Sequence, residues 1–170
     1  MILRGQGVCL CPFDRRHFEA TRTWANDPAL SLLLDRARPV SDTEHERWTA
    51  SLNGRGDCVY FAIETPASHH VGNIWLWAID PRHRKAEVRI VIGDIQSVGR
   101  GMGSDAIRLL SEYAGDRLNL RRLYAYVLAT NPRARRAFEK AGFELEGTLR
   151  RDRWVGGEYA DVWLLGRLWS

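Results

Sequence analysis

Cysteine, lysine and long apolar runs are all scarce in this chain of 170 residues. No apolar run approaches the roughly eighteen residues of a membrane-spanning helix, and the polar start does not look like a signal peptide. We therefore expect a cytoplasmic protein without a membrane partner. The three cysteines, Cys9, Cys11 and Cys58, lack the paired spacing of zinc ligands, so we expect core residues and no metal site.

The shortage of lysine contrasts with an excess of arginine, 23 against 2, and the formal net charge is +4. A basic chain raises the question of nucleic-acid binding. The arginines, however, are spread along the sequence, and no zinc-finger, helix-turn-helix or RNP-type pattern accompanies them. We therefore expect no nucleic-acid partner.

The length favours one domain over residues 1–170. Hydrophobic periodicity predicts strands at 8–12, 58–64, 71–79, 85–92, 122–127, 143–150 and 159–168. Helices are predicted from Asp14 to Asn26, after the capping-box residue Ser41, over 106–118 and after Asn131. Asp27-Pro28 is interpreted as a helix stop, followed by a mobile stretch to about residue 40.

The most informative motif is QSVGRGMG at Gln96–Gly103, where Gly99, Gly101 and Gly103 alternate directly before an amphipathic helix. Such a loop presents backbone N–H groups to a phosphate. No lysine follows Gly103 as in a Walker A loop, and the spacing does not fit a G-x-G-x-x-G dinucleotide fingerprint. The alternative is a tight turn that binds nothing, although a plain turn needs fewer glycines.

A second segment, NPRARRAFEKAGF, follows at Asn131–Phe143. Asn131 is a good N-cap, Pro132 suits the first helical position, and Gly142 suits the C-terminal stop. In their order and spacing, these two segments resemble the two signatures of the GNAT superfamily of N-acetyltransferases. The resemblance covers nearly the whole chain.

The resemblance implies an α+β fold with a mixed, mostly antiparallel central sheet, helices on both faces and splayed central strands. It also implies acetyl-CoA as cosubstrate, and transfer of the acetyl group to a primary amine by direct attack on the thioester. The implied cofactor-binding residues are Val91, Ile92, Gly99, Arg100, Gly101, Met102, Gly103, Ser104, Asn131 and Phe138. A backbone N–H near Val91 or Ile92 would stabilise the oxyanion. Asn131 is implied both as helix cap and as a contact at the catalytic centre.

Glu87 is the candidate base that would deprotonate the amine. Strand alternation in AEVRIVI places Glu87, Arg89 and Val91 on one face. Charged residues inside an otherwise apolar strand favour a position that lines a cleft, and the family often has a water-linked glutamate there. The alternative is a Glu87–Arg89 ion pair on a solvent-exposed face.

Phe138 stands where many members of the family have a tyrosine general acid, so that role cannot be carried over to it. A thiol has a pKa of about 8.5, so the thiolate can leave without strong acid assistance. Tyr126 or Tyr159 could supply a proton, although each suits a core or strand position better. A non-catalytic acyl-CoA-binding module is therefore the competing hypothesis.

The candidate acceptor-binding residues are Trp24, Trp48, Trp75, Glu87 and Arg89. Trp24 and Trp48 lie in two early helices that usually wall the acceptor site in this family, although core packing is the default for a tryptophan. The resemblance favours a protein N-terminus, an amino sugar or a similar small amine as acceptor. A polyamine or an aminoglycoside is the alternative, and a chain of charge +4 is not an obvious polyamine binder. We also expect a homodimer.

Overall fold

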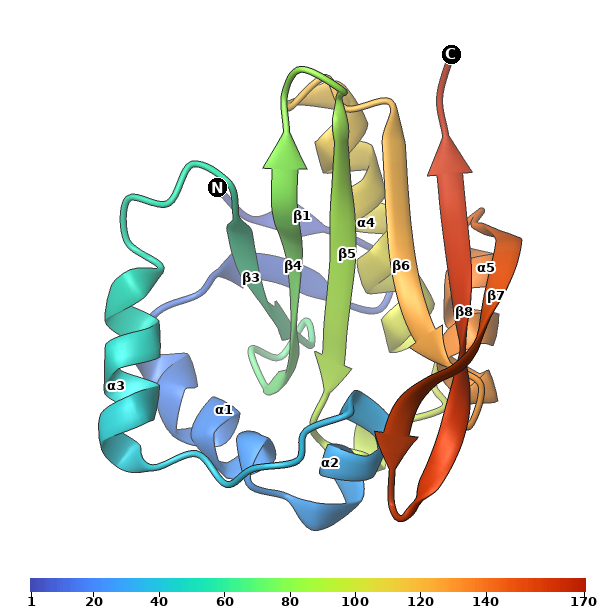
Figure 1. Cartoon of the computed structure of the whole chain (residues 1–170). Helices are drawn as coiled ribbons and strands as arrows, with labels where there is room; N and C mark the ends of the chain where they lie inside the picture. Colours follow the sequence, from blue (N-terminus) through green and yellow to red (C-terminus); the bar gives the residue numbers. More distant parts are fainter.

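The computed structural model describes residues 1–170, except for the side chain of Ile95. Its strands form one sheet in the order β1-β2-β3-β4-β5-β6-β8-β7 (Figure 1). Only β5 and β6 pair in parallel among the neighbouring strands that the structure describes. The strands are β1 (Leu3–Arg4), β2 (Cys9–Pro12), β3 (Val59–Glu64), β4 (His70–Asp80), β5 (Lys85–Ile92), β6 (Arg122–Leu128), β7 (Glu144–Val155) and β8 (Glu158–Leu168).

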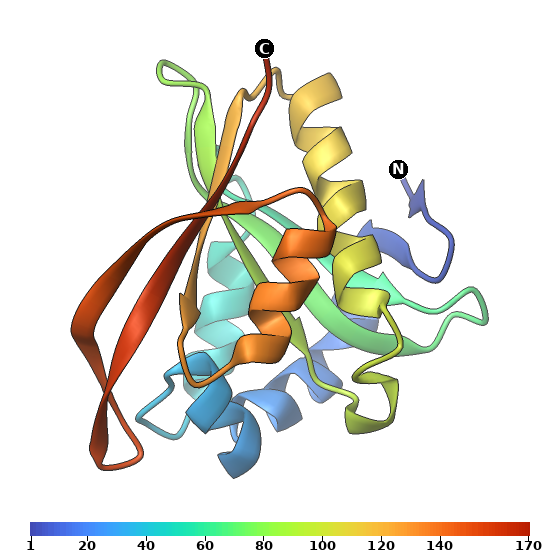
Figure 2. The same ribbon diagram turned by 90° about the vertical axis from the view of Figure 1, so that its right-hand side faces the viewer.

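Helices cover both faces of this sheet. Figure 2 shows α4 and α5 in front of the sheet and α3 behind it. The helices are α1 (Phe18–Ala25), α2 (Pro28–Leu34), α3 (Asp42–Ser51), α4 (Met102–Asp116) and α5 (Pro132–Lys140), with short 3-10 turns η1 (Arg15–His17) and η2 (Ile95–Ser97). None of the helices described is long and apolar enough to cross a bilayer. The predicted α+β architecture is confirmed.

The main core lies between the sheet and α4. Ile107 and Leu110, one turn apart on α4, are fully buried and belong to the same apolar cluster as Ile74 and Leu76 of β4 and Leu123 of β6. Burying a side chain of this size contributes about 1.5–3 kcal/mol. This packing fixes the beginning of α4 relative to the end of β5.

The helix stop predicted at Asp27-Pro28 is confirmed, because α1 ends at Ala25. The stretch that follows was wrongly predicted to lack a helix, because α2 occupies Pro28–Leu34. Asp27 also begins the next helix: its carboxylate accepts hydrogen bonds from the N–H groups of Ala29 and Leu30 and caps α2, with Pro28 in the first helical position. An N-cap followed by proline is a helix start, which was the available signal. The helix ends at Asp35, a non-glycine residue in the left-handed region with φ of 54°.

The central strands β5 and β6 separate along their length, as predicted. Their pairing runs only from Lys85–Arg122 to Glu87–Tyr124. Beyond Glu87, β5 continues to Ile92 and β6 to Leu128, with β6 paired to β8 on its other side. The two strands therefore splay, and the sheet opens on the side where the glycine loop follows β5.

Candidate active site

A cavity of about 410 Å³ lies where β5 and β6 separate; we call it the splay cavity. Residues of β5, β6, α2 and α5 contribute to its lining. It brings together seven of the residues that the sequence singled out: Trp75, Glu87, Arg89, Val91, Tyr126, Asn131 and Phe138. The structure thus unites side chains that are up to 63 positions apart in the sequence, from 75 to 138.

A second cavity, of about 400 Å³, lies between α1, α3 and the sheet; we call it the aromatic cavity. Trp24, Trp48 and Tyr60 contribute aromatic rings to its lining. Val91 and Arg36 line both cavities, so the two adjoin beside the end of β5. A reactant in each cavity would meet the other at this junction.

The glycine loop lies outside the linings of both cavities, as does Ile92. Gly99 and Gly101 have φ of 84° and 78°, a conformation that side chains disfavour, and the space where a Cβ would stand at either position is open. Gly101 is the N-cap of α4, so Met102, Gly103 and Ser104 form the first turn of the helix. The N–H groups of a first turn have no acceptor within the helix. A Cβ on Gly103 would lie 3.7 Å from that of Ala137 in α5, which places the loop beside the helix that carries Phe138.

Glu87 combines the two alternatives that its sequence position allowed. Its carboxylate does pair with Arg89, at 2.9 Å from Nη2. The pair is not on an open face, however: Glu87 is only 9% exposed and lines the splay cavity, while the Arg89 side chain is 44% exposed. Burial, reinforced by the nearby Glu87 carboxylate, raises the pKa of Tyr124, the residue paired with Glu87 across β6.

Asn131 caps the beginning of α5, and Phe138 lies in its last turn. The Asn131 side-chain oxygen accepts the Ala134 N–H at 3.2 Å, so its predicted role as helix cap is confirmed. Phe138 is 3% exposed and packs edge-on against Phe143, with ring centroids 5.1 Å apart. Its apolar ring helps to close one end of the splay cavity.

Tyr126 and Tyr159, the two tyrosines considered as proton donors, are not core residues, although both lie on strands as expected. Tyr126 is 45% exposed and Tyr159 is 55% exposed. Tyr126 lines the splay cavity, whereas Tyr159 packs edge-to-face against Trp154 in the β7–β8 hairpin. Strand alternation alone could not tell which face of β6 would meet a cavity, because the cavity exists only where β5 turns away.

The predicted acceptor tryptophans line the cavities from three directions. Trp24 of α1 packs flat over the end of β5, so closely that a Cβ on Gly93 would collide with its indole. Trp75 of β4 stacks on Tyr60 of β3 with centroids 4.6 Å apart. Because Trp75 lines the splay cavity and Tyr60 the aromatic cavity, this stacked pair forms part of the wall between them.

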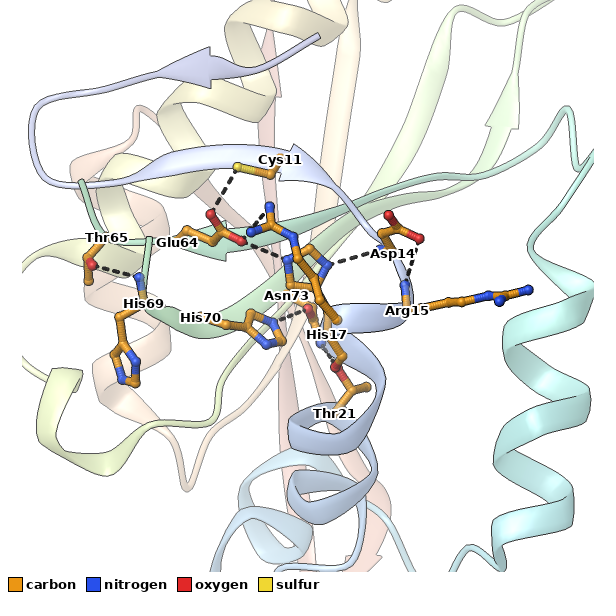
Figure 3. A network of polar contacts seen from close by, with 11 residues as sticks. Cys11, Asp14, Arg15, His17, Thr21, Glu64, Thr65, His69, His70 and Asn73 are labelled. Carbon is orange, nitrogen blue, oxygen red and sulfur yellow. Dashed lines mark hydrogen bonds and ion pairs between the residues drawn. The ribbon is translucent and has the colours of Figure 1, made fainter. Parts of the chain in front are cut away.

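A buried polar network fastens the start of α1 to the sheet (Figure 3). Glu64 of β3 accepts hydrogen bonds from His17 Nε2 at 2.7 Å and from Cys11 Sγ at 3.4 Å, and pairs with Arg16 at 2.9 Å. The other ring nitrogen of His17 accepts the Asp14 N–H at 3.0 Å, which leaves the proton on Nε2. The core position expected of all three cysteines is confirmed only for Cys11, whose thiol also serves as a donor, whereas Cys9 and Cys58 are partly buried.

The network extends to the floor of the aromatic cavity. Thr21 donates to the His17 carbonyl at 2.7 Å and accepts from the Asn73 amide at 2.9 Å, and Asn73 in turn contacts His70 Nε2 at 2.9 Å. Thr21 and Asn73 both line the cavity. The sequence analysis did not identify Thr21 and Asn73, because a single polar residue in an otherwise apolar segment was the only signal of this network. It did not identify Arg36 either, which follows α2 and carries no sequence motif.

Replacing Glu64 by Gln should destabilise the fold at neutral pH by about 1.5–3 kcal/mol, because hydrogen bonds to a charged group are lost. Burial would raise the Glu64 pKa, but the hydrogen bonds from His17 and Cys11 and the Arg16 charge outweigh it, so the pKa is lowered. This stabilisation is present above the unfolded pKa of about 4.3 and disappears as the pH falls through the folded value. Urea unfolding of both proteins at a series of pH values measures it. An unfolding free-energy difference that stays constant down to pH 3 would contradict the assignment.

Comparison of the sequence with known proteins identifies the family to which the chain belongs. A family model described as an acetyltransferase (GNAT) domain matches residues 8–144. The spermidine N(1)-acetyltransferase of Vibrio cholerae is 32% identical over 102 residues, which cover 60% of this chain and 58% of that protein. The corresponding Escherichia coli K12 protein is 34% identical over 91 residues, 54% of this chain and 48% of that protein. The matches therefore span about half the length of these curated relatives.

Solved structures extend the similarity over the whole fold. The crystal structure of spermidine N-acetyltransferase from Vibrio cholerae, in complex with CoA and spermine, superposes with a TM-score of 0.88. It has 25% sequence identity, and the match covers 95% of each chain. The predicted family and fold are confirmed: the chain belongs to the acetyltransferase (GNAT) domain family.

Proposed function

We propose that this chain transfers an acetyl group from acetyl-CoA to a primary amine, with the thioester in the splay cavity and the amine in the aromatic cavity. The observation that supports this most directly is that the two cavities adjoin at Val91. The similar Vibrio cholerae protein was crystallised with CoA, which supports acetyl-CoA as cosubstrate. The single domain over residues 1–170, the cytoplasmic location and the homodimer stay predictions.

The residues around the splay fit the cosubstrate. Beyond Glu87, the N–H and C=O groups of β5 that point toward β6 have no hydrogen-bond partner on β6. They would therefore bind the amide groups of the pantetheine arm. A backbone N–H near Val91 would then stabilise the oxyanion. The glycine loop and the free N–H groups at the start of α4 would hold the pyrophosphate. Arg100, exposed in that loop, would meet the same phosphates.

Glu87 would act as the base through a chain of several water molecules in the splay cavity. Glu87 and Val91 lie four residues apart on one strand, a separation of about 13 Å, which is too long for direct contact with an amine beside Val91. A bridged proton transfer would leave the neutral amine to attack the thioester carbonyl. The C–N bond forms, the C–S bond breaks, and CoA leaves as the thiolate and takes up a proton.

Tyr126 is the hydroxyl that could donate this last proton, because it lines the same cavity as Phe138. Tyr126→Phe should lower turnover, by up to the roughly hundredfold effect of a positioned acid, and Phe138→Tyr should restore part of the loss. Tyr159→Phe, which removes an exposed hydroxyl outside both cavities, is the control. Equal turnover of Tyr126→Phe and the wild type would mean that the thiolate leaves unaided.

Phe138 itself should be structural. Phe138→Ala should cost about 3–5 kcal/mol of stability, because the ring is buried against Phe143. Thermal unfolding measures this cost. A Phe138→Ala protein that keeps its full stability and loses only turnover would show that the ring acts on the reaction.

The proposed function itself is tested by thiol release from acetyl-CoA with a panel of peptides, amino sugars and polyamines. We expect release that depends on an acceptor. Tight acetyl-CoA binding without release on any acceptor would instead support the competing hypothesis of a non-catalytic acyl-CoA-binding module.

A further inference from the structure

Arg36 stands at the junction of the two cavities. It lines both of them and is half-buried, in the segment that follows α2. Among the residues that the structure describes, no carboxylate lies within ion-pair distance of its guanidinium. Burial lowers the pKa of Arg36, as expected of a cation without a neutralising partner, although a guanidinium stays charged at neutral pH.

The carboxylates that line the cavities already have other partners. Glu87 pairs with Arg89 at 2.9 Å, and Asp35 pairs with Arg153 at 3.0 Å. Glu44 accepts the Ser41 N–H at 2.9 Å in the capping box of α3. Glu44 also interacts electrostatically with Arg38, so these two charges offset each other in the lining of the aromatic cavity. Arg36 remains as the unbalanced positive charge at the junction.

An unpaired, half-buried guanidinium favours one kind of ligand. Its planar fork of donors matches a carboxylate or a phosphate, and hydrogen bonds to such a charged partner are roughly twice as strong as neutral ones. A second cation placed beside it would be repelled. The phosphates of CoA do not serve here in our proposal, because the glycine loop that would hold them lines neither cavity.

We propose that the amine acceptor carries an anionic group, a carboxylate or a phosphate, which binds Arg36 while the amine reaches the thioester beside Val91. This inference rests on the proposed function and narrows its acceptor class. It sets this chain apart from the curated spermidine acetyltransferases that it resembles, because a polyamine would bring further cations to Arg36.

Matched acceptor pairs test the inference with the full chain and acetyl-CoA. One pair is a dipeptide and its C-terminal amide, the other is glucosamine 6-phosphate and glucosamine, and spermidine represents the polycations. We expect kcat/KM to favour the anionic member of at least one pair by roughly tenfold or more. The pair that discriminates identifies the anion as a carboxylate or a phosphate.

Substitution of Arg36 tests whether its guanidinium causes the preference for the anionic acceptor. Arg36→Gln should bring the ratio of kcat/KM within the pair close to one, Arg36→Lys should keep part of it, and acetyl-CoA affinity should change little. Arg82→Gln, at an exposed turn outside both cavities, should keep the full ratio. Measuring the ratio, rather than turnover alone, separates specificity from a general loss of folding.

Two results would overturn the inference while leaving the proposed function intact. One is that the neutral members or spermidine are acetylated at least as efficiently as the anionic ones. The other is an Arg36→Gln protein whose ratio equals that of the wild type. If no acceptor releases thiol from acetyl-CoA, the proposed function fails, and the inference fails with it.

Discussion

Glu87→Gln should lower acetyl transfer at neutral pH by roughly 10²–10⁴-fold, the range typical of a positioned general base. The substitution keeps the shape of a residue that is 9% exposed but removes its ability to accept a proton. Turnover of the variant should recover partly at high pH, where bulk deprotonation of the amine replaces the base. A rate–pH profile of both proteins with one acceptor measures this difference.

The substitution also breaks the ion pair with Arg89, so a control has to separate charge pairing from base catalysis. Glu146→Gln breaks a comparable carboxylate–guanidinium pair, with Arg122 at 2.7 Å, outside both cavities. We expect it to leave turnover nearly unchanged at every pH. If the Glu87→Gln profile overlays that of the wild type throughout, Glu87 has no part in proton transfer.

Gly101→Val should weaken acetyl-CoA binding by at least roughly tenfold for each charge-assisted hydrogen bond that the pyrophosphate loses. The position of a Cβ at Gly101 is open, so the side chain would occupy the space through which a phosphate approaches the start of α4. Calorimetric titration with acetyl-CoA measures the affinity. The assignment of the loop fails if a folded variant binds with unchanged affinity.

Backbone strain would accompany this substitution, because Gly101 has φ of 78°. A non-glycine residue in that region costs on the order of 1–3 kcal/mol. Gly54 provides a matched control: its φ is 77° and its Cβ position is equally open, but it lies in the turn after α3. Gly54→Val should therefore lose similar stability and keep full acetyl-CoA affinity, which isolates the effect on the phosphate.

Several local features could be predicted from the sequence because short-range chemistry dictates them. The Asn131 cap, the helix start after the glycine loop and the strand alternation in 85–92 depend only on neighbouring residues. The same rules correctly ended the first helix before Asp27-Pro28. They overlooked that these two residues also begin α2, because an N-cap with proline and a helix stop share the same residue types.

The sequence by itself determined the family, because both signatures are contiguous motifs whose glycine, asparagine and apolar positions carry the information. It also named several residues that line the splay cavity, but not Arg36, and it placed the glycine loop at a site that this cavity does not include. Only the tertiary structure decided how these residues meet. Where β5 leaves β6 depends on the packing of the whole sheet, and this departure opens the cavity beside Glu87, Tyr126 and Phe138. The folding of α2 likewise brings Arg36 to the junction, since whether a cation finds a carboxylate depends on which distant elements surround it.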